Sequence, residues 1–240
     1  MKAMIFAAGL GTRLKPLTEH IPKALVKVND KPLLERSINY LAKYGFNEII
    51  INIHHFPNEV KGFLSSFNDK HINISISDET DMLLETGGGL KKAAPFFLEN
   101  KAPFALVNVD ILTDLDLSKM LAFHNEQNSI ATLAVMKRNS SRQLLFDQNK
   151  TLKGWKNDQT NETKPPNLDC HQLESFAFSG IHIVSTKIFE LFDERQKFSI
   201  TDTYINLCKS WKIKGFDHTG DKFIDVGKPG SVEQASLMFE

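Results

Sequence analysis

The first 110 residues alternate between two hydrophobic patterns. Apolar runs predict strands over residues 2–7, 48–53, 72–76 and 104–109. Between these runs, apolar residues at helical spacing predict helices over residues 31–45, 57–67 and 87–97. Asp30 precedes Lys31-Pro32 and is expected to cap the first of these helices. Repeated strand–helix–strand units of this length predict a mostly parallel sheet.

After residue 110 the pattern becomes less regular. Shorter strands are predicted within residues 129–135, 144–155, 176–184 and 223–226. Helices are predicted over residues 117–123, 186–192 and 201–211 and after Gly230, and residues 159–169 predict a long surface loop. No repeat, low-complexity tract or linker divides the sequence. We therefore predict one α/β domain, with a mostly parallel mixed sheet flanked by helices.

The balance of charges excludes several classes of partner. The 240 residues carry 29 Lys+Arg and 29 Asp+Glu, whereas a nucleic-acid binder usually has a basic excess. No apolar run approaches the roughly 18–20 residues that a membrane span needs, and residues 1–8 are too short for a signal-peptide core. Cys170 and Cys208 form no C-x-x-C pair, which excludes a disulfide framework and a four-cysteine zinc site. We expect a cytoplasmic protein that binds neither nucleic acid nor membrane.

A glycine-containing loop follows the first strand. Gly9 and Gly11 allow close backbone approach, so successive N–H groups of this loop can surround a phosphate. Arg13 and Lys23 add positive charge nearby. A dinucleotide fingerprint needs a third glycine where this chain has Leu14, and the spacing of a Walker loop is absent. The loop therefore predicts phosphate binding, and a tight turn without a ligand is the alternative.

Four motifs follow one another in a fixed order along the chain. They are Gly9-Leu10-Gly11-Thr12-Arg13 with Pro22-Lys23, then residues 84–89 (Leu-Glu-Thr-Gly-Gly-Gly), 107–110 (Val-Asn-Val-Asp) and 223–227 (Phe-Ile-Asp-Val-Gly). This series resembles the signature of the sugar-1-phosphate nucleotidyltransferases, over residues 1 to about 235. Among the branches, it most resembles the N-acetylmuramate-1-phosphate uridylyltransferases. The short mannose- and heptose-1-phosphate guanylyltransferases are close behind.

The resemblance implies a Rossmann-like fold of the nucleotide-diphospho-sugar transferase type. It implies a nucleotide-binding half over residues 1–112 and a sugar-phosphate-binding half over residues 113–240. The implied reaction transfers a nucleotidyl group from a nucleoside triphosphate (NTP) to a sugar 1-phosphate and releases pyrophosphate. In the family, Mg²⁺ is held at the positions of Asp110 and Asp225, and Mg²⁺ takes one or two carboxylates plus phosphate oxygens. Without the resemblance, either aspartate could cap a helix or a turn.

The resemblance also assigns the remaining site residues. Arg13, Lys23 and Asp110 are the implied catalytic residues: Arg13 holds the leaving pyrophosphate, and Lys23 lies between the phosphates of the two substrates. Nucleotide binding is implied for Ala7, Ala8, Gly9, Leu10, Gly11, Thr12, Glu85, Thr86, Gly87 and Gly88, the last four forming the wall beside the base. Asn108 and Gly180 are implied at the sugar phosphate. The glycines at 87 and 88 could equally begin a helix, and Gly180 could mark a strand bulge.

Two departures from the family pattern concern the loop and the sugar. Ala24 stands where the family often has a second proline. In the uridylyltransferase branch an acidic residue follows an Arg-Gly pair, and in the corresponding residues 142–147 it is missing or has moved to Asp147. A phosphocholine cytidylyltransferase and a non-catalytic nucleotide-sugar sensor remain alternatives. Asp114 and Asp116 are expected to cap the helix after them. The apolar residues 237–239 are expected to form an apolar face of the last helix or a homo-oligomer contact.

Overall fold

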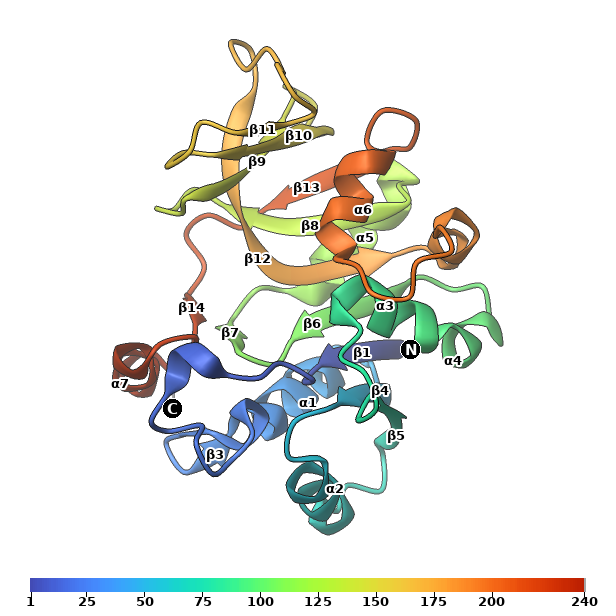
Figure 1. Ribbon diagram of the computed structural model, residues 1–240. Coiled ribbons are helices and arrows are strands. Elements are labelled where there is room, and N and C mark those ends of the chain that lie inside the picture. The colour runs from blue at the N-terminus through green and yellow to red at the C-terminus, as the bar shows by residue number, and fades with distance from the viewer. Residues whose placement is uncertain (240) are drawn as a thin grey trace.

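A single ten-stranded sheet forms the centre of the computed structural model, which describes residues 1–239 (Figure 1). Its parallel part has the order β6–β1–β4–β5. These strands are Phe104–Asn108 (β6), Lys2–Phe6 (β1), Glu48–Ile53 (β4) and Asn73–Asp78 (β5). They match the four predicted runs, and their carboxyl ends lie at one edge of the sheet.

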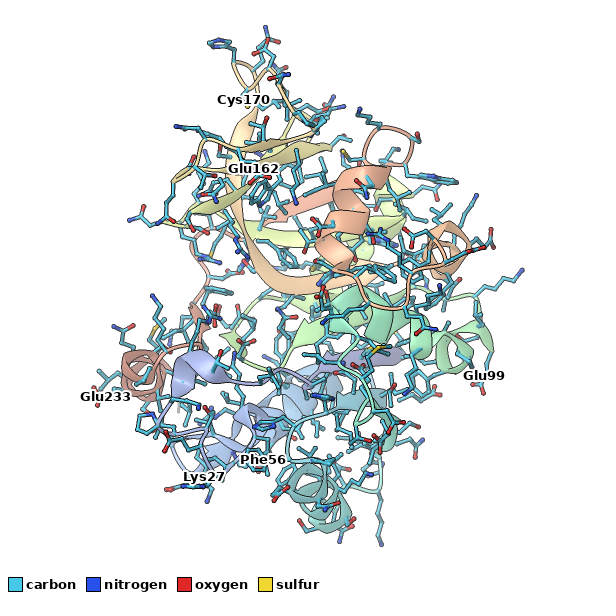
Figure 2. The ribbon with its side chains drawn as sticks, in the orientation of Figure 1. Lys27, Phe56, Glu99, Glu162, Cys170 and Glu233 are labelled. Atoms are coloured by element: carbon cyan, nitrogen blue, oxygen red, sulfur yellow. The ribbon has the colours of Figure 1, made fainter. Side chains whose placement is uncertain are left out.

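One long strand, β12 (Glu174–Val184), joins the parallel part to an antiparallel part. Its first residues pair with β9, its last residues pair with β6, and β8 pairs with the same last residues from the opposite edge. The other strands of this part are Ala131–Met136 (β8), Arg142–Phe146 (β9), Leu152–Asn157 (β10), Thr163–Lys164 (β11) and Ile213–Asp217 (β13). Of these, β13 pairs with β8 in parallel at the edge. Glu162 and Cys170 lie at the end of the molecule that β9–β11 form (Figure 2). The predicted mixed α/β fold is confirmed.

Helices cover both faces of the sheet. The first face, which includes Ala3 and Ile5 of β1, packs against Leu33–Lys43 (α1), Pro57–Ser66 (α2), Leu117–Gln127 (α5) and Pro229–Met238 (α7). The second face, which includes Met4 and Phe6, packs against Glu85–Lys92 (α3), Ala94–Leu98 (α4), Thr186–Leu191 (η3, a 3₁₀ helix) and Ile200–Leu207 (α6). Alternate residues of β1 thus enter two apolar cores, as a strand buried on both faces requires. No helix among the described residues is long and apolar enough to cross a membrane.

Short elements position the loops around the carboxyl edge of the sheet. Thr12–Leu14 (η1) and Lys23–Leu25 (η2) are single 3₁₀ turns; η1 follows the loop after β1, and η2 follows residues 15–22. Lys27–Val28 (β2) and Lys31–Pro32 (β3) form a small hairpin. Ile111–Thr113 (β7) pairs with Phe223–Asp225 (β14), which brings a segment near the end of the chain back to the end of β6.

Several predicted boundaries were wrong. Asp30 does not cap α1: Asn29 and Asp30 have φ angles of 48° and 61° and make the two-residue turn of the β2–β3 hairpin, and α1 begins at Leu33. The predicted helix over residues 87–97 begins at Glu85 and is interrupted at Ala93, and the predicted loop over residues 159–169 contains β11. The helix predicted to reach residue 211 ends at Leu207, before strand β13.

Candidate functional site

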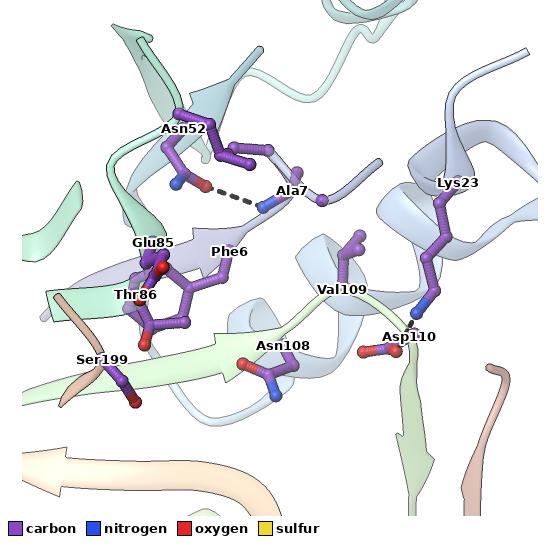
Figure 3. A pocket seen from close by; sticks show the side chains of 13 residues that line it. Phe6, Ala7, Lys23, Asn52, Glu85, Thr86, Asn108, Val109, Asp110 and Ser199 are labelled. Atoms are coloured by element: carbon purple, nitrogen blue, oxygen red, sulfur yellow. Dashed lines mark hydrogen bonds and ion pairs between the residues drawn. The ribbon is translucent and has the colours of Figure 1, made fainter. Parts of the chain in front are cut away.

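The carboxyl ends of β1, β4 and β6 border a cavity of about 330 Å³, named here the inner cavity (Figure 3). Its lining comes from three strand ends, the loops beside them, η2 and the start of α3, namely Phe6, Ala7, Ala8, Gly9, Lys23, Asn52, Leu83, Glu85, Thr86, Asn108, Val109, Asp110 and Ser199. Eight predicted site residues are in this set: Ala7, Ala8, Gly9, Lys23, Glu85, Thr86, Asn108 and Asp110. The volume is within the range of small-ligand sites.

The loop after β1 turns sharply at Gly11. Gly11 has a φ of 66°, and a Cβ atom there would lie 3.0 Å from the Thr18 methyl carbon and 3.1 Å from the Lys23 Cβ. The Gly11 carbonyl accepts hydrogen bonds from the Leu14 N–H at 2.9 Å and from the Thr18 hydroxyl at 2.8 Å. This turn packs the loop against Lys23, and only glycine fits it without strain. Leu10 and Thr12 lie in the same loop and are exposed.

A buried hydrogen-bond chain ties this loop to the wall at α3. The Asn52 Oδ1 accepts from the Ala7 N–H at 2.7 Å, and the Asn52 Nδ2 donates to the Glu79 carboxylate at 2.8 Å. The other carboxylate oxygen of Glu79 accepts from the Leu84 N–H at 3.2 Å. Only 1% of Glu79 is exposed, and this burial raises the pKa of its carboxyl group. The chain fixes the distance between the two sides of the inner cavity.

Two aspartates from distant segments meet beside the inner cavity. Asp110 follows β6 and forms an ion pair with Lys23, and both side chains are 13% exposed. Asp225 ends β14 opposite Ile111, and the Val226 N–H donates to the Asp110 carbonyl at 2.8 Å. Desolvation and the negative charge of Asp110 raise the pKa of the Asp225 carboxyl, while Lys23 and Arg13 oppose this rise. Two adjacent carboxylates suit a divalent metal bound together with phosphate oxygens.

Beyond Asp225 lies a larger cavity of about 1250 Å³, named here the outer cavity. It is lined by Arg13, Arg138, Asn139, Ser140, Ser141, Arg142, Gln143, Asp158, Gln159, Asp225, Gly227, Lys228 and Ser231. A Cβ atom on Gly227 would lie 2.7 Å from the Asp225 Oδ1 and 3.0 Å from the Arg13 Nη2. Arg13 and Asp225 therefore lie against the same glycine. The predicted catalytic cations are thus divided between two cavities, Lys23 in the inner and Arg13 in the outer.

The glycines at the start of α3 have a packing role. Both the Gly87 and the Gly88 N–H groups donate to the Phe198 carbonyl, at 2.8 and 3.2 Å. A Cβ atom would lie 2.3 Å from the Phe198 ring at Gly87 and 2.0 Å from the Gln196 carbonyl oxygen at Gly88. Neither glycine lines the inner cavity, whereas Glu85 and Thr86 do. Gly87 and Gly88 let residues 196–198 approach α3, and this places Ser199 at the cavity.

Asn108 and Gly180 lie in contact. Gly180 has a φ of 72°, and the register of β12 against β8 breaks between Phe178 and His182, so Gly180 forms a bulge. A Cβ atom on Gly180 would lie 2.8 Å from the Asn108 amide nitrogen and 2.9 Å from an Ile111 side-chain carbon. The bulge gives the Asn108 amide the space that it occupies between the sheet and the cavity.

Other aspartates named from the sequence have structural partners. Asp116 caps α5 by accepting from the Ser118 and Lys119 N–H groups, as predicted. The same prediction for Asp114 was wrong, because its carboxylate instead accepts from the Lys222 N–H of a distant segment. Asp147 accepts from the Asn149 and Thr151 N–H groups in the turn between β9 and β10. Its carboxylate is therefore used within that turn. Cys170 and Cys208 are both free thiols.

Sequence reasoning missed Asn52, Ser199 and Arg138. Asn52 interrupts the isoleucine run of β4, and its position near the carboxyl end of the strand could have indicated a site residue. Ser199 precedes α6 and accepts from the Thr201 N–H, so its sequence context indicates only a helix cap. Arg138 follows β8 in a segment without any motif, and nothing in the sequence places it near Asp225.

Comparisons with known proteins agree with this geometry. A model of the nucleotidyl transferase family matches residues 2–240. The mannose-1-phosphate guanyltransferase of Gibberella zeae is 29% identical over 230 residues, which cover 95% of this chain and 61% of that protein. The UTP–glucose-1-phosphate uridylyltransferase of Synechocystis sp. is 35% identical over 144 residues, covering 55% of this chain and 36% of that protein. The chain thus spans about three fifths of the length of the guanyltransferase relatives that it matches.

Solved structures extend the similarity over the whole fold. HddC from Yersinia pseudotuberculosis, complexed with GMP-PN, superimposes with a TM-score of 0.76 at 25% identity, over 100% of this chain and 99% of that one. UDP-glucose pyrophosphorylase from Acinetobacter baumannii gives a TM-score of 0.78 at 18% identity, over 98% and 92% of the two chains, and so supports the fold alone. With the family model matched from residue 2 onward, the chain belongs to the nucleotidyl transferase family.

Proposed function

We propose that this chain transfers a nucleotidyl group from an NTP to a sugar 1-phosphate, yielding a nucleotide-diphosphate sugar and pyrophosphate. The observation that carries this proposal is the meeting of Lys23, Asp110 and Asp225 between two cavities. One cavity has a glycine loop and a base-sized wall, and the other has an excess of cations. A reaction that joins two phosphate-bearing substrates needs this division.

In the proposed reaction, an oxygen of the acceptor phosphate attacks the α-phosphorus of the NTP. A new P–O bond forms, the bond to the α–β bridging oxygen breaks, and the electron pair leaves with pyrophosphate. The attacking oxygen is already ionised, so no general base is needed. Catalysis then depends on placing the substrates and neutralising charge.

The side chains have separate tasks in this reaction. Lys23, between the glycine loop and Asp110, draws the two phosphates together. Arg13, beside Asp225 in the outer cavity, stabilises the departing pyrophosphate. The two aspartates fit Mg²⁺, which takes one or two carboxylates with substrate oxygens and would neutralise charge on the transferring phosphate. Glu79 and Asn52 keep the loop and the base wall at a fixed separation.

The inner-cavity wall restricts the choice of base. Glu85 supplies a carboxylate acceptor there, with Thr86 and Ser199 as neighbouring hydroxyls. Uracil and guanine carry ring N–H donors on the Watson–Crick edge, whereas cytosine has an acceptor nitrogen at that position. We place uridylyl transfer to N-acetylmuramate 1-phosphate first. Guanylyl transfer to mannose or heptose 1-phosphate is the second candidate, supported by the names of the relatives and by the guanine nucleotide bound to HddC.

A substrate panel tests the proposal. Pyrophosphate release would be measured with Mg²⁺ for UTP, GTP, CTP and dTTP, each combined with N-acetylmuramate, mannose, heptose or glucose 1-phosphate or phosphocholine. We expect release with one sugar 1-phosphate pair, loss of activity in Asp110→Asn, and retained activity in the control Asp114→Asn, which lies outside both cavities. Nucleotide binding without release in any pair would favour the sensor, and release with phosphocholine would favour the cytidylyltransferase.

A further inference from the structure

The outer cavity has more positive than negative charge. Four cations line it, Arg13, Arg138, Arg142 and Lys228, against two carboxylates, Asp158 and Asp225. Such a lining favours an anionic ligand, and guanidinium groups are suited to the oxygens of a phosphate. Whichever phosphate binds here, the cation that is held most rigidly will define its position.

Arg138 is the most constrained of these cations. Its Nη2 donates to the Phe178 carbonyl at 2.9 Å, and its guanidinium carbon lies 4.9 Å from the centre of the Phe223 ring. Arg138 is partly buried, whereas Arg13 and Arg142 are exposed. A guanidinium already fixed by a carbonyl and an aromatic ring loses little further freedom when it binds an anion.

The guanidinium of Arg138 also has an unused donor. Its Nε is shielded from solvent and has no hydrogen-bond acceptor among residues 1–239. Buried donors of native proteins nearly always have a partner, and an unpaired one calls for an explanation. A ligand oxygen that reaches this N–H while Asp225 lies nearby would provide the missing acceptor.

The surroundings of Arg138 indicate which substrate supplies that oxygen. The glycine loop, Lys23 and Glu85 line the inner cavity, on the nucleotide side. Phe178, whose carbonyl holds Arg138, instead lines a third cavity of about 580 Å³ together with Trp155. The third and outer cavities share Ser140 and Arg142. A sugar ring placed on the aromatic side chains would carry its 1-phosphate toward Arg138.

We infer that Arg138 binds the phosphate of the acceptor and fixes it beside Asp225, ready to attack the nucleotide. This inference rests on the proposed function for the identity of the acceptor. The Nε and one terminal nitrogen of Arg138 offer two parallel N–H groups to two phosphate oxygens, a geometry that lysine cannot reproduce. Arg138 therefore acts on the affinity for the sugar 1-phosphate and has little effect on the affinity for the NTP.

Steady-state kinetics of Arg138→Met and Arg138→Lys, with the active pair from the panel, test this role. Arg138→Met should raise the KM for the sugar 1-phosphate by at least about tenfold and change the KM for the NTP less than about twofold. Arg138→Lys should lie between wild type and Arg138→Met. The control Lys137→Met, at the exposed neighbouring position, should match wild type. Inhibition by the unphosphorylated sugar should be the same in all variants. A general structural defect would instead weaken this inhibition as well.

Calorimetry with inorganic phosphate makes the test independent of turnover. Wild type and Lys137→Met should bind phosphate more tightly than Arg138→Met, and circular dichroism would verify that each variant is folded. If Arg138→Met does not fold, Arg138→Lys carries the comparison. A wild-type protein that turns over no substrate pair but binds phosphate more tightly than Arg138→Met would overturn the proposed function. The same result would still support the phosphate site at Arg138. Unchanged acceptor KM and phosphate affinity, or a raised KM for the NTP alone, would overturn the inference.

Discussion

Replacing Gly180 with alanine tests whether the bulge in β12 positions the Asn108 amide. Gly180 has a φ of 72°, and its new Cβ would lie 2.8 Å from the Asn108 nitrogen and 2.9 Å from an Ile111 carbon. Both distances are shorter than a Cβ tolerates, so Asn108 must move or β12 must shift. Asn108 lines the inner cavity, so its displacement would change the place where the two proposed substrates meet.

Two effects determine the size of the loss in the Gly180→Ala variant. An L-residue in the left-handed region costs about 1–2 kcal/mol, and the lower freedom of the unfolded chain returns about 0.4–1 kcal/mol. Overpacking of a core position adds about 1–3 kcal/mol. We expect the free energy of unfolding to fall by about 2–4 kcal/mol in total.

Gly45→Ala is a matched control for the backbone effect. Gly45 has a φ of 79°, and the nearest atom to its new Cβ would be the Met1 methyl carbon at 3.6 Å, an ordinary contact. This variant has the backbone strain without the crowding, so we expect it to lose only about 1 kcal/mol. It lies outside the described cavity linings and should leave the kinetics unchanged.

Urea unfolding and steady-state kinetics together check the Gly180 prediction. The linear dependence on urea gives the free energy of unfolding for both variants and wild type. We expect Gly180→Ala to be less stable than Gly45→Ala and to raise the acceptor KM. Equal losses of stability in the two variants would refute the crowding argument. An unchanged acceptor KM in a folded Gly180→Ala protein would refute the role given to Asn108.

Three further predictions concern the metal site, the buried chain and pH. Asp110→Asn and Asp225→Asn should each lower kcat/KM on the order of 10²–10³-fold. Asp225→Asn should do so without lowering the melting temperature, because it removes one of two adjacent negative charges, whereas Asp110→Asn also breaks the ion pair with Lys23 and should lower it; a lower melting temperature of Asp225→Asn would contradict this. Asn52→Ala leaves the Ala7 N–H and one oxygen of the Glu79 carboxylate without partners, so urea unfolding should show a loss of about 2–4 kcal/mol, and an unchanged free energy of unfolding would refute the role of this hydrogen-bond chain. Burial lowers the pKa of His182 to about 3 from 6.5, so the unfolded chain takes up a proton that the folded protein excludes. Stability should be complete above pH 6.5 and fall as the pH drops toward 3, by at most about 1.4 kcal/mol per pH unit, and a slope unchanged in His182→Gln would contradict this assignment.

The parallel half of the fold was predictable because its signals are local. In β4, five of six residues between Glu48 and Ile53 are buried, and such a continuous run has one interpretation in a chain of alternating strands and helices. The ends of β1 and β6 were therefore predicted to within about one residue, and so was the position of the residues that follow them at the carboxyl edge of the sheet. The turn of the β2–β3 hairpin was harder to predict, because Asn29-Asp30 suits a two-residue turn with positive φ as well as it suits a helix cap.

The site residues that come from the antiparallel half could not be placed from the sequence. Asp225 reaches Asp110 only because β14 pairs with β7, a pairing of two three-residue strands that no hydrophobic period marks. Arg138 reaches the same point because the bulge in β12 leaves the Phe178 carbonyl free to accept its Nη2 hydrogen. Pairing register and bulges arise from the packing of distant strands, and they are invisible to residue spacing.

This difference between the halves explains how one edge of a sheet would join the two substrates of the proposed reaction. The nucleotide side is built from loops that directly follow parallel strands, so its residues stay in place by local geometry and by the Asn52–Glu79 chain. The acceptor side is built on β12, whose bulge at Gly180 sets Asn108 on one side and, through Phe178, Arg138 on the other. A single backbone irregularity therefore couples the cation of the outer cavity to the amide of the inner cavity. Changes in β12 that alter the bulge should therefore raise the acceptor KM, whatever sugar the acceptor carries.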